Sequence, residues 1–424
     1  MSAHATSVAP DAAVKPAGRQ AAMPFIMLTV LLDVMAIGLI IPVLPALVGS
    51  FVANPGEQAF WYGVVTFAFG FANFFAAPVL GALSDRYGRR PVLLVGFSGL
   101  ALSFFTTAMA HTIWVLVVVR LFSGAMQANA AVANAYVADI TAPDQRAKRF
   151  GMLGAMFGLG FILGPVMGGL LGAHDLHLPF FAAGALAVCN WFYGLLVLPE
   201  SLPVERRHAV EWKQVNPIAS LKRLAELKGV GALVAVIGLS SLAQMVLHTS
   251  WVLYTTFKFG WGPAENGWSL FAVGVMGVIV QGGLIRLALK RWPAERIAVM
   301  GLISSTLCYA LWGLASQGWM MYAVVALNVF GFMANTAVQS LISNAADDTT
   351  QGQTMGSVAS LTSLTAVLAP VLGAALLGVV SHLPRGDWRI GAPFFLCAAL
   401  QALSTGFAVL HFRRSGRQAR AVAA

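Results

Sequence analysis

Long apolar segments alternate with short basic ones along the whole chain. Twelve apolar runs of roughly 20 residues can be traced, and each is long enough for a helix to cross a hydrocarbon layer of about 30 Å. Lipid offers no hydrogen-bond partner, so the backbone N–H and C=O groups of each run must pair with one another, and such runs are expected to be helices. They lie near 24–48, 60–80, 91–110, 113–137, 150–172, 179–198, 229–254, 266–286, 297–315, 319–343, 354–380 and 391–412.

The composition supports a membrane protein. Of 424 residues, 58% are hydrophobic and 10% are charged, whereas about a quarter of a soluble domain is charged. An ordinary soluble enzyme and a disordered chain are therefore excluded. The net charge of +10 does not indicate nucleic acid, because the basic residues lie in short clusters between apolar runs. Three cysteines lie within apolar runs and indicate neither a disulfide set nor a metal site: Cys189, Cys308 and Cys397.

The distribution of basic residues predicts the orientation. With twelve spans and both termini in the cytoplasm, 22 of the 26 Lys and Arg residues fall on the cytoplasmic side. The opposite side has only Lys258, Arg385 and Arg389, and Arg120 lies within a span. A miscounted span would invert every later loop and destroy this asymmetry.

The order of the segments predicts five regions. Residues 1–22 are expected to be a disordered cytoplasmic tail, 23–198 and 229–412 two six-helix bundles, and 413–424 a second tail. The linker 199–228 carries Ile218, Leu221, Leu224 and Leu227 at helical spacing, which favours an amphipathic helix on the membrane surface; a plain solvated linker is the alternative. Residues 163–168 match residues 368–373, which indicates two pseudo-symmetric halves.

Two formally charged residues lie well inside the spans, Asp33 in the first and Arg120 in the fourth. Facing lipid, each would cost about 2.5–3.5 kcal/mol or more. We therefore expect them to face a water-filled cavity or each other. In the functional interpretation Asp33 carries a proton and Arg120 tunes it; a static ion pair between two helices is the alternative.

Several uncharged polar residues also lie in apolar runs. Each can either line a substrate cavity or hydrogen-bond a neighbouring helix, and for His248 packing is the more common role. The candidate cavity residues are Gln127, Asn129, Asn134, Gln244, His248, Asn335 and Gln339.

The turn between the second and third runs carries a G-x-L-x-D-R-x-G-R-R pattern. Its two glycines permit close packing and a sharp turn, and its arginines can bond helix C-termini or acids on the facing bundle. The motif residues are Gly81, Asp85, Arg86, Gly88, Arg89 and Arg90. This pattern closely resembles the signature loop of the major facilitator superfamily.

Two further segments strengthen the resemblance. Arg120 to Gly124 with Ala135 to Thr141 resembles the fourth-span motif of proton-driven members. The fifth run resembles the superfamily's antiporter motif, in which glycines admit another helix closely and proline permits a bend. Its residues are Gly154, Gly158, Gly160, Gly164, Pro165, Gly168 and Gly169.

The resemblance is closest to the tetracycline/proton antiporters among the twelve-span drug exporters. It implies an all-α membrane protein with the major facilitator fold, in which the signature loop gates the cytoplasmic side. It also implies acids in spans one, three and nine, of which only Asp33 is present, because Ser103 and Ser305 stand at the other two positions.

The sequence and the resemblance together predict a proton-coupled antiporter. It would export an amphipathic organic compound, tetracycline-like or otherwise, from a bacterial inner membrane, as a monomer, with the proton as coupling ion and no cofactor, metal or catalytic residue. An uptake symporter for a small metabolite is the alternative. A non-transporting sensor and an intramembrane enzyme are disfavoured, the latter because no nucleophile with a base is evident.

Overall fold

A computed structural model describes residues 17–127, 129–142, 145–207, 231–345 and 351–423. Within these ranges the protein is helical and has no strand. Eleven helices are long and apolar enough to cross a membrane, and a bent pair, Gly318–Leu327 with Val329–Ile342, makes twelve if it is one span. All twelve predicted runs correspond to these segments, so the predicted all-α membrane fold is confirmed.

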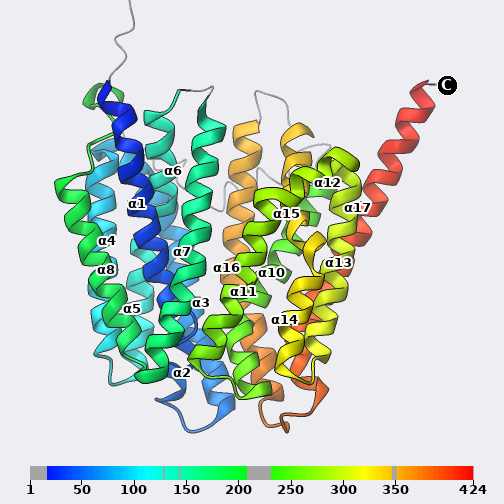
Figure 1. Ribbon diagram of the computed structural model, residues 1–424, viewed down its shortest axis with the longest axis horizontal. Helices are drawn as coiled ribbons and strands as arrows, with labels where there is room; N and C mark the ends of the chain where they lie inside the picture. The colour runs from blue at the N-terminus through cyan, green and yellow to red at the C-terminus, as the bar shows by residue number, and fades with distance from the viewer. Residues whose placement is uncertain (1–16, 128, 143–144, 208–230, 346–350, 424) are drawn as a thin grey trace, which may run out of the picture.

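The helices form two halves that stand side by side, blue to green and green to red in Figure 1. The first half contains α1 (Ala17–Ile40), α2 (Leu44–Gly49), α3 (Pro55–Tyr87), α4 (Arg89–Ala108), α5 (Ile113–Met126), α6 (Asn129–Ile140), α7 (Arg146–His174) and α8 (Leu178–Leu196), followed by the short η2 (Val204–Arg206). The second contains α10 (Gly231–Phe259), α11 (Pro263–Ile279), the π-helical η3 (Val280–Leu284), α12 (Ile285–Arg291), α13 (Ala294–Leu314), α14 (Gly318–Leu327), α15 (Val329–Ala345), α16 (Gln351–Val380), η4 (Trp388–Gly391) and α17 (Ala392–Ala423).

The predicted tails differ from the structure. Helix α1 already begins at Ala17, inside the stretch expected to be disordered, and α17 continues through the predicted tail to Ala423. Both helices therefore extend past the apolar runs that predicted the spans. Most of the predicted amphipathic linker lies outside the described residues.

The two halves meet through two equivalent helix pairs. Helix α7 packs on α11, and α16 packs on α3. Helices α7 and α11 form spans five and eight, and α16 and α3 form spans eleven and two. Exchanging the two halves therefore converts one pair into the other. Pro165 lies inside α7 and Pro370 inside α16, at the positions that the internal repeat aligns. The contacts therefore have the pseudo-symmetry that the repeat indicates.

The hydrophobic core is shared at one end of the molecule and divided at the other. We call the end where α1 begins and α17 finishes the terminus end, and the opposite one the far end (Figure 1). One buried cluster, including Leu47, Val65 and Tyr254, joins both halves at the far end. Toward the terminus end the first half has its own cluster around Tyr136, and the second half has another around Ile297. The halves thus diverge from the far end toward the terminus end.

Candidate functional site

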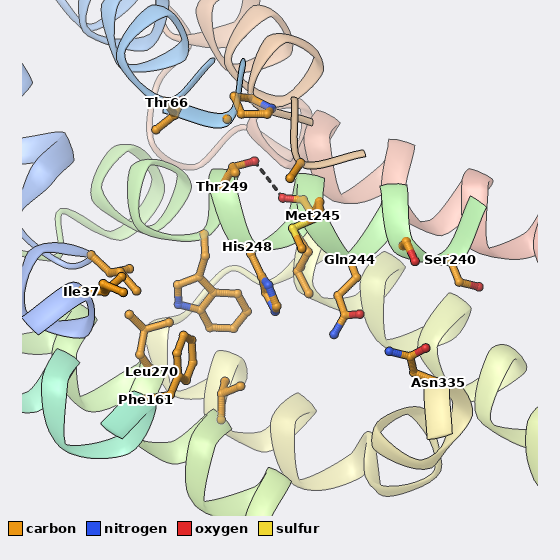
Figure 2. A pocket seen from close by; sticks show the side chains of 18 of the residues that line it. Ile37, Thr66, Phe161, Ser240, Gln244, Met245, His248, Thr249, Leu270 and Asn335 are labelled. Carbon is orange, nitrogen blue, oxygen red and sulfur yellow. Dashed lines mark hydrogen bonds between the residues drawn. The ribbon is translucent and has the colours of Figure 1, made fainter. Parts of the chain in front are cut away.

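A cavity of about 540 Å³ lies between the halves and is lined by residues of both. Gln127 lines it from the first half, and Gln244, His248 and Asn335 line it from the second. Figure 2 shows Gln244 and His248 projecting from the same side of α10, with Asn335 of α15 pointing toward Gln244. Its volume is typical of small-molecule sites. Four of the seven predicted cavity residues therefore line this cavity.

The other three predicted cavity residues do not line it. Asn129 is buried against Asp33. Asn134 is exposed, because five residues of helix rotate it about 140° away from Asn129. Gln339 is also exposed and lies beyond Val338, the last residue of α15 that lines the cavity. These three residues are therefore not among those that line the cavity in this conformation.

Arg120 projects into the cavity wall from α5 and is 6% exposed. Its Nε and Nη2 atoms are buried and have no hydrogen-bond partner. Tyr62 and Ser123 line the same region. The guanidinium is therefore a buried cation without a protein counter-ion, as no carboxylate is within ion-pair distance of it in the described part of the chain.

Asp33 lies apart from this cavity. Its carboxylate accepts a hydrogen bond from Asn129 Nδ2 at 2.9 Å, in a small cleft that includes Leu93 of α4 and Phe157 of α7. The expectation that Asp33 faces Arg120 or the central cavity was wrong. The reason is helix packing: α1 contacts mainly α7, α8 and α6, whereas α5 contacts α3 and α4.

The helix of the fourth span is interrupted between Arg120 and Asn129, the residue that contacts Asp33. Helix α5 ends at Met126 and α6 begins at Asn129. Asn73 of α3 donates from Nδ2 to the carbonyl of Gln127 at 2.8 Å and to that of Gly124 at 3.4 Å, which satisfies backbone oxygens at the break. Asn73 also lines the cavity. The sequence reasoning missed it, although a single amide in an otherwise apolar run was a usable signal.

The tenth span has a similar break. Helices α14 and α15 meet at 48°, and Asn328 stands between them, where its Oδ1 accepts a hydrogen bond from Ser304 Oγ at 3.2 Å. Asn328 and Ser305 both line the cavity. Spans four and ten occupy equivalent places in the two halves, and the helix of each is interrupted, at Gln127 and at Asn328.

The signature loop is held within the first half. The turn contains Gly88, whose φ of 103° requires a glycine. Arg89 pairs with Asp85 at 2.6 Å and with Asp139 of α6 at 3.0 Å. Glu200, just after α8, accepts from the backbone N–H groups of Arg89 at 2.9 Å and of Arg90 at 3.2 Å.

The remaining loop residues differ in role. The guanidinium of Arg90 donates to the carbonyls of Gly194 and Leu195 at the C-terminus of α8, as predicted for a helix end. Arg86 is exposed. A Cβ at Gly81 would meet nothing within 4 Å, so the close packing predicted there is absent in this conformation. No bond of the loop to the facing half is seen among the described residues.

Helix α7 carries the predicted antiporter motif, and its glycines contact α1 on one side and α11 on the other. Gly160, Gly164 and Gly168 pack against α1, where a Cβ at Gly168 would lie 1.9 Å from the carbonyl oxygen of Leu39. A Cβ at Gly169 would lie 2.5 Å from the Pro263 carbonyl oxygen of α11, but one at Gly158 would lie 3.7 Å from Val278, and one at Gly154 would meet nothing within 4 Å. The spacing between α7 and α11 thus widens toward the terminus end.

The chain is similar to bacterial drug-resistance proteins. It is 37% identical to the class C tetracycline resistance protein of Escherichia coli, over 89% of this chain and 95% of that protein. It is 35% identical to the class D protein of Salmonella ordonez, over 86% and 92%. It is 33% identical to the class B protein of Escherichia coli, over 88% and 93%.

Solved structures share the fold at low sequence identity. The human organic anion transporter MFSD10 (TETRAN) matches with a TM-score of 0.69 at 22% identity, over 93% of this chain and all of that one. The nucleoside transporter NupG matches with a TM-score of 0.73 at 14% identity, over 92% and 99%.

The family model described as Major Facilitator Superfamily matches residues 26–370, most of both halves. With the twelve predicted spans and the shared cavity, this match establishes a multi-pass membrane transporter and not an enzyme. The chain belongs to the major facilitator superfamily.

Proposed function

We propose that the protein is a proton-coupled antiporter that exports an amphipathic organic compound across a bacterial inner membrane. The relatives that support this are tetracycline resistance proteins of bacteria, similar over nearly their whole length. The terminus end would face the cytoplasm, since 22 of the 26 basic residues fall on that side of the twelve spans. One chain contributes both walls of the cavity, which is consistent with a functional monomer.

The observation that carries the proposal is the isolation of Asp33. Among the described residues its carboxylate has one hydrogen-bond partner, the amide of Asn129, and no cation within ion-pair distance. A deeply placed carboxyl group without a counter-ion is costly when ionised. Such a group can hold a proton while it is shielded from water and release it when the surrounding helices admit water, with no metal or other cofactor.

The break in span four offers a route of coupling. Asn129, which contacts Asp33, is the first residue of α6. Gln127 and Arg120 line the cavity from the α5 side of the break. A solute that moves α5 would therefore move the residue that donates to the carboxylate. In this mechanism the proton and the solute use separate sites that share the fourth span, and the inward proton gradient drives the outward step.

The test uses everted membrane vesicles that hold an acid-inside gradient, with tetracycline as the first probe and a panel of amphipathic drugs after it. The wild type should release protons when a transported compound is added. Asp33→Asn should release none, yet it should still exchange labelled for unlabelled substrate across the membrane, because exchange needs no net proton movement. Glu205→Gln, an exposed acid outside the spans, is the matched control and should behave as wild type.

Full gradient-driven transport by Asp33→Asn would overturn the role of that carboxyl group. If no compound of the panel causes proton release in the wild type, antiport itself is wrong. Retained exchange in Asp33→Asn shows that the variant is folded, so a loss of proton release cannot be attributed to misfolding.

A further inference from the structure

Arg120 is the one formally charged residue among the described residues that line the cavity. Its side chain is nearly fully buried, and two of its three guanidinium nitrogens lack a hydrogen-bond partner. Buried donors that stay unpaired are unfavourable, the more so when they carry charge. A buried guanidinium without an anionic partner among the described residues indicates that its anion comes from outside the chain.

The neighbourhood contains no acid that could take this place. The titratable residues of the cavity besides Arg120 are Tyr62, His248 and Tyr309, and neither Asp nor Glu lines it within the described part of the chain. Asp33 is occupied by Asn129 in a separate cleft. Span four cannot turn its guanidinium toward water outside the bundle, because α3 and α4 pack against α5.

The opposite wall is aromatic and apolar. Trp251, Tyr309 and Trp312 of the second half line the same cavity, with the rings of Tyr309 and Trp312 stacked at 5.9 Å and those of Trp251 and Trp312 edge to face at 5.1 Å. A cavity of about 540 Å³ holds a molecule of drug size. One wall is thus cationic and the other suited to a flat hydrophobic ring.

We propose that the cavity selects amphipathic organic anions, whose carboxylate, sulfonate or enolate group binds the guanidinium of Arg120 while the apolar body lies against Trp251 and Trp312. The selection deepens the proposed export function by naming its substrate class. Each of these groups carries a negative charge on oxygen that accepts charge-assisted hydrogen bonds from a guanidinium, and a carboxylate or sulfonate offers two oxygens at once, whereas an amine cation is repelled and a neutral amide carries no charge.

The test compares three probes built on the same ring, dansylate (a sulfonate anion), dansylamide (neutral) and dansylcadaverine (a cation). Binding to the purified full-length protein in detergent is measured by energy transfer from tryptophan to the dansyl group. The wild type should bind dansylate about tenfold or more tightly than dansylamide, since hydrogen bonds to charged groups contribute on the order of 1.5–3 kcal/mol. Dansylcadaverine should bind most weakly.

Arg120→Gln should remove the preference for dansylate and leave dansylamide binding unchanged, which also shows that the cavity is intact. Arg86→Gln, an exposed arginine outside the cavity, should keep the wild-type preference. The proposal is overturned if dansylate binds no more tightly than dansylamide, including the case in which neither binds, if dansylcadaverine binds best, or if Arg120→Gln retains the preference.

The binding test is independent of proton coupling. No gradient is present in detergent, and Asp33→Asn should keep the preference for dansylate. A failure of antiport with this preference intact would refute the proposed coupling alone. Proton-driven export with no preference for dansylate would refute the anion site alone.

Discussion

The contact between the two halves differs sharply between the far end and the terminus end. At the far end a Cβ at Gly63 would lie 2.6 Å from that of Ala374, and one at Gly169 would lie 2.5 Å from the Pro263 carbonyl oxygen. Toward the terminus end, Cβ atoms at Gly154 and Gly282 would meet nothing within 4 Å. Glycines therefore permit close contact between the halves at the far end, whereas those toward the terminus end border open space.

The buried clusters follow this difference. A single cluster crosses from one half to the other at the far end, and two separate clusters stabilise the halves toward the terminus end. Each half can therefore move as a body about the far-end contact without exposing its own core. We interpret this conformation as closed at the far end, with the opposite conformation requiring that contact to open.

The largest expected effect comes from locking the far end. The Cβ of Ala59 on α3 and a Cβ at Gly378 on α16 would be 3.9 Å apart, within the range of disulfides. In a background without the three native cysteines, Ala59→Cys with Gly378→Cys should cross-link under mild oxidant and abolish transport. Transport is measured in vesicles before and after dithiothreitol, which should restore it.

Each single-cysteine variant should transport normally under the same oxidant. Transport that continues while the cross-link is complete would show that the far end does not need to open. The comparison of the two ends would then describe a static feature and not an alternating one.

A smaller effect is expected from filling the α7–α11 contact at one end or the other. Gly169→Val places methyl groups against the backbone of Pro263 and Gly267, and such overpacking costs about 1–3 kcal/mol. It should shift the population away from this conformation by about tenfold. Labelling of a cysteine at Gln244 by an impermeant maleimide, added from the far-end side, should become faster by a similar factor.

Gly154→Val is the matched control at the open end. Its side chain meets open space in this conformation, so labelling of the same cysteine from the far-end side should not increase. Faster labelling in both variants would show that valine perturbs α7 in general and that the two ends are equivalent.

Hydropathy and charge are enough to predict the fold because polar and charged residues are costly in the hydrocarbon layer, so each span must be a long apolar run. The twelve runs, the pseudo-symmetric halves and the glycine-rich α7 were all evident from the sequence. The direction in which a residue points around its helix was not. Asp33 and Arg120 both lie well inside their spans, but α1 and α5 are not neighbours, so position along the helix alone could not show that Asp33 contacts Asn129.

The interruptions of the helices in spans four and ten were also not predicted from the sequence. No proline or glycine stands at Gln127 or at Asn328, where the helices of spans four and ten are interrupted. At the interruption in span four, Asn73 from another helix donates hydrogen bonds to the carbonyls of Gln127 and Gly124. Contacts of this kind depend on tertiary packing, which local sequence does not record.

The smallest effect concerns the terminus end, where the signature loop stabilises one half and not the contact between halves. Arg89 is buried and bonded to Asp85 and Asp139, and Arg86 is exposed. Removing a buried partner leaves acids uncompensated, so Arg89→Gln should lower the melting temperature of the detergent-solubilised protein by about 3 °C or more. Arg86→Gln should lower it by less than about 1 °C, as is usual for surface changes.

The far-end cross-link between Ala59→Cys and Gly378→Cys provides the second measurement for these variants. Since every bond of Arg89 stays within the first half, Arg89→Gln should leave the rate of that cross-link unchanged while it lowers the melting temperature. A slower cross-link would mean that the loop controls the far-end contact from the other side of the molecule. Equal melting temperatures for the two arginine variants would mean that the buried network contributes no more to stability than an exposed side chain.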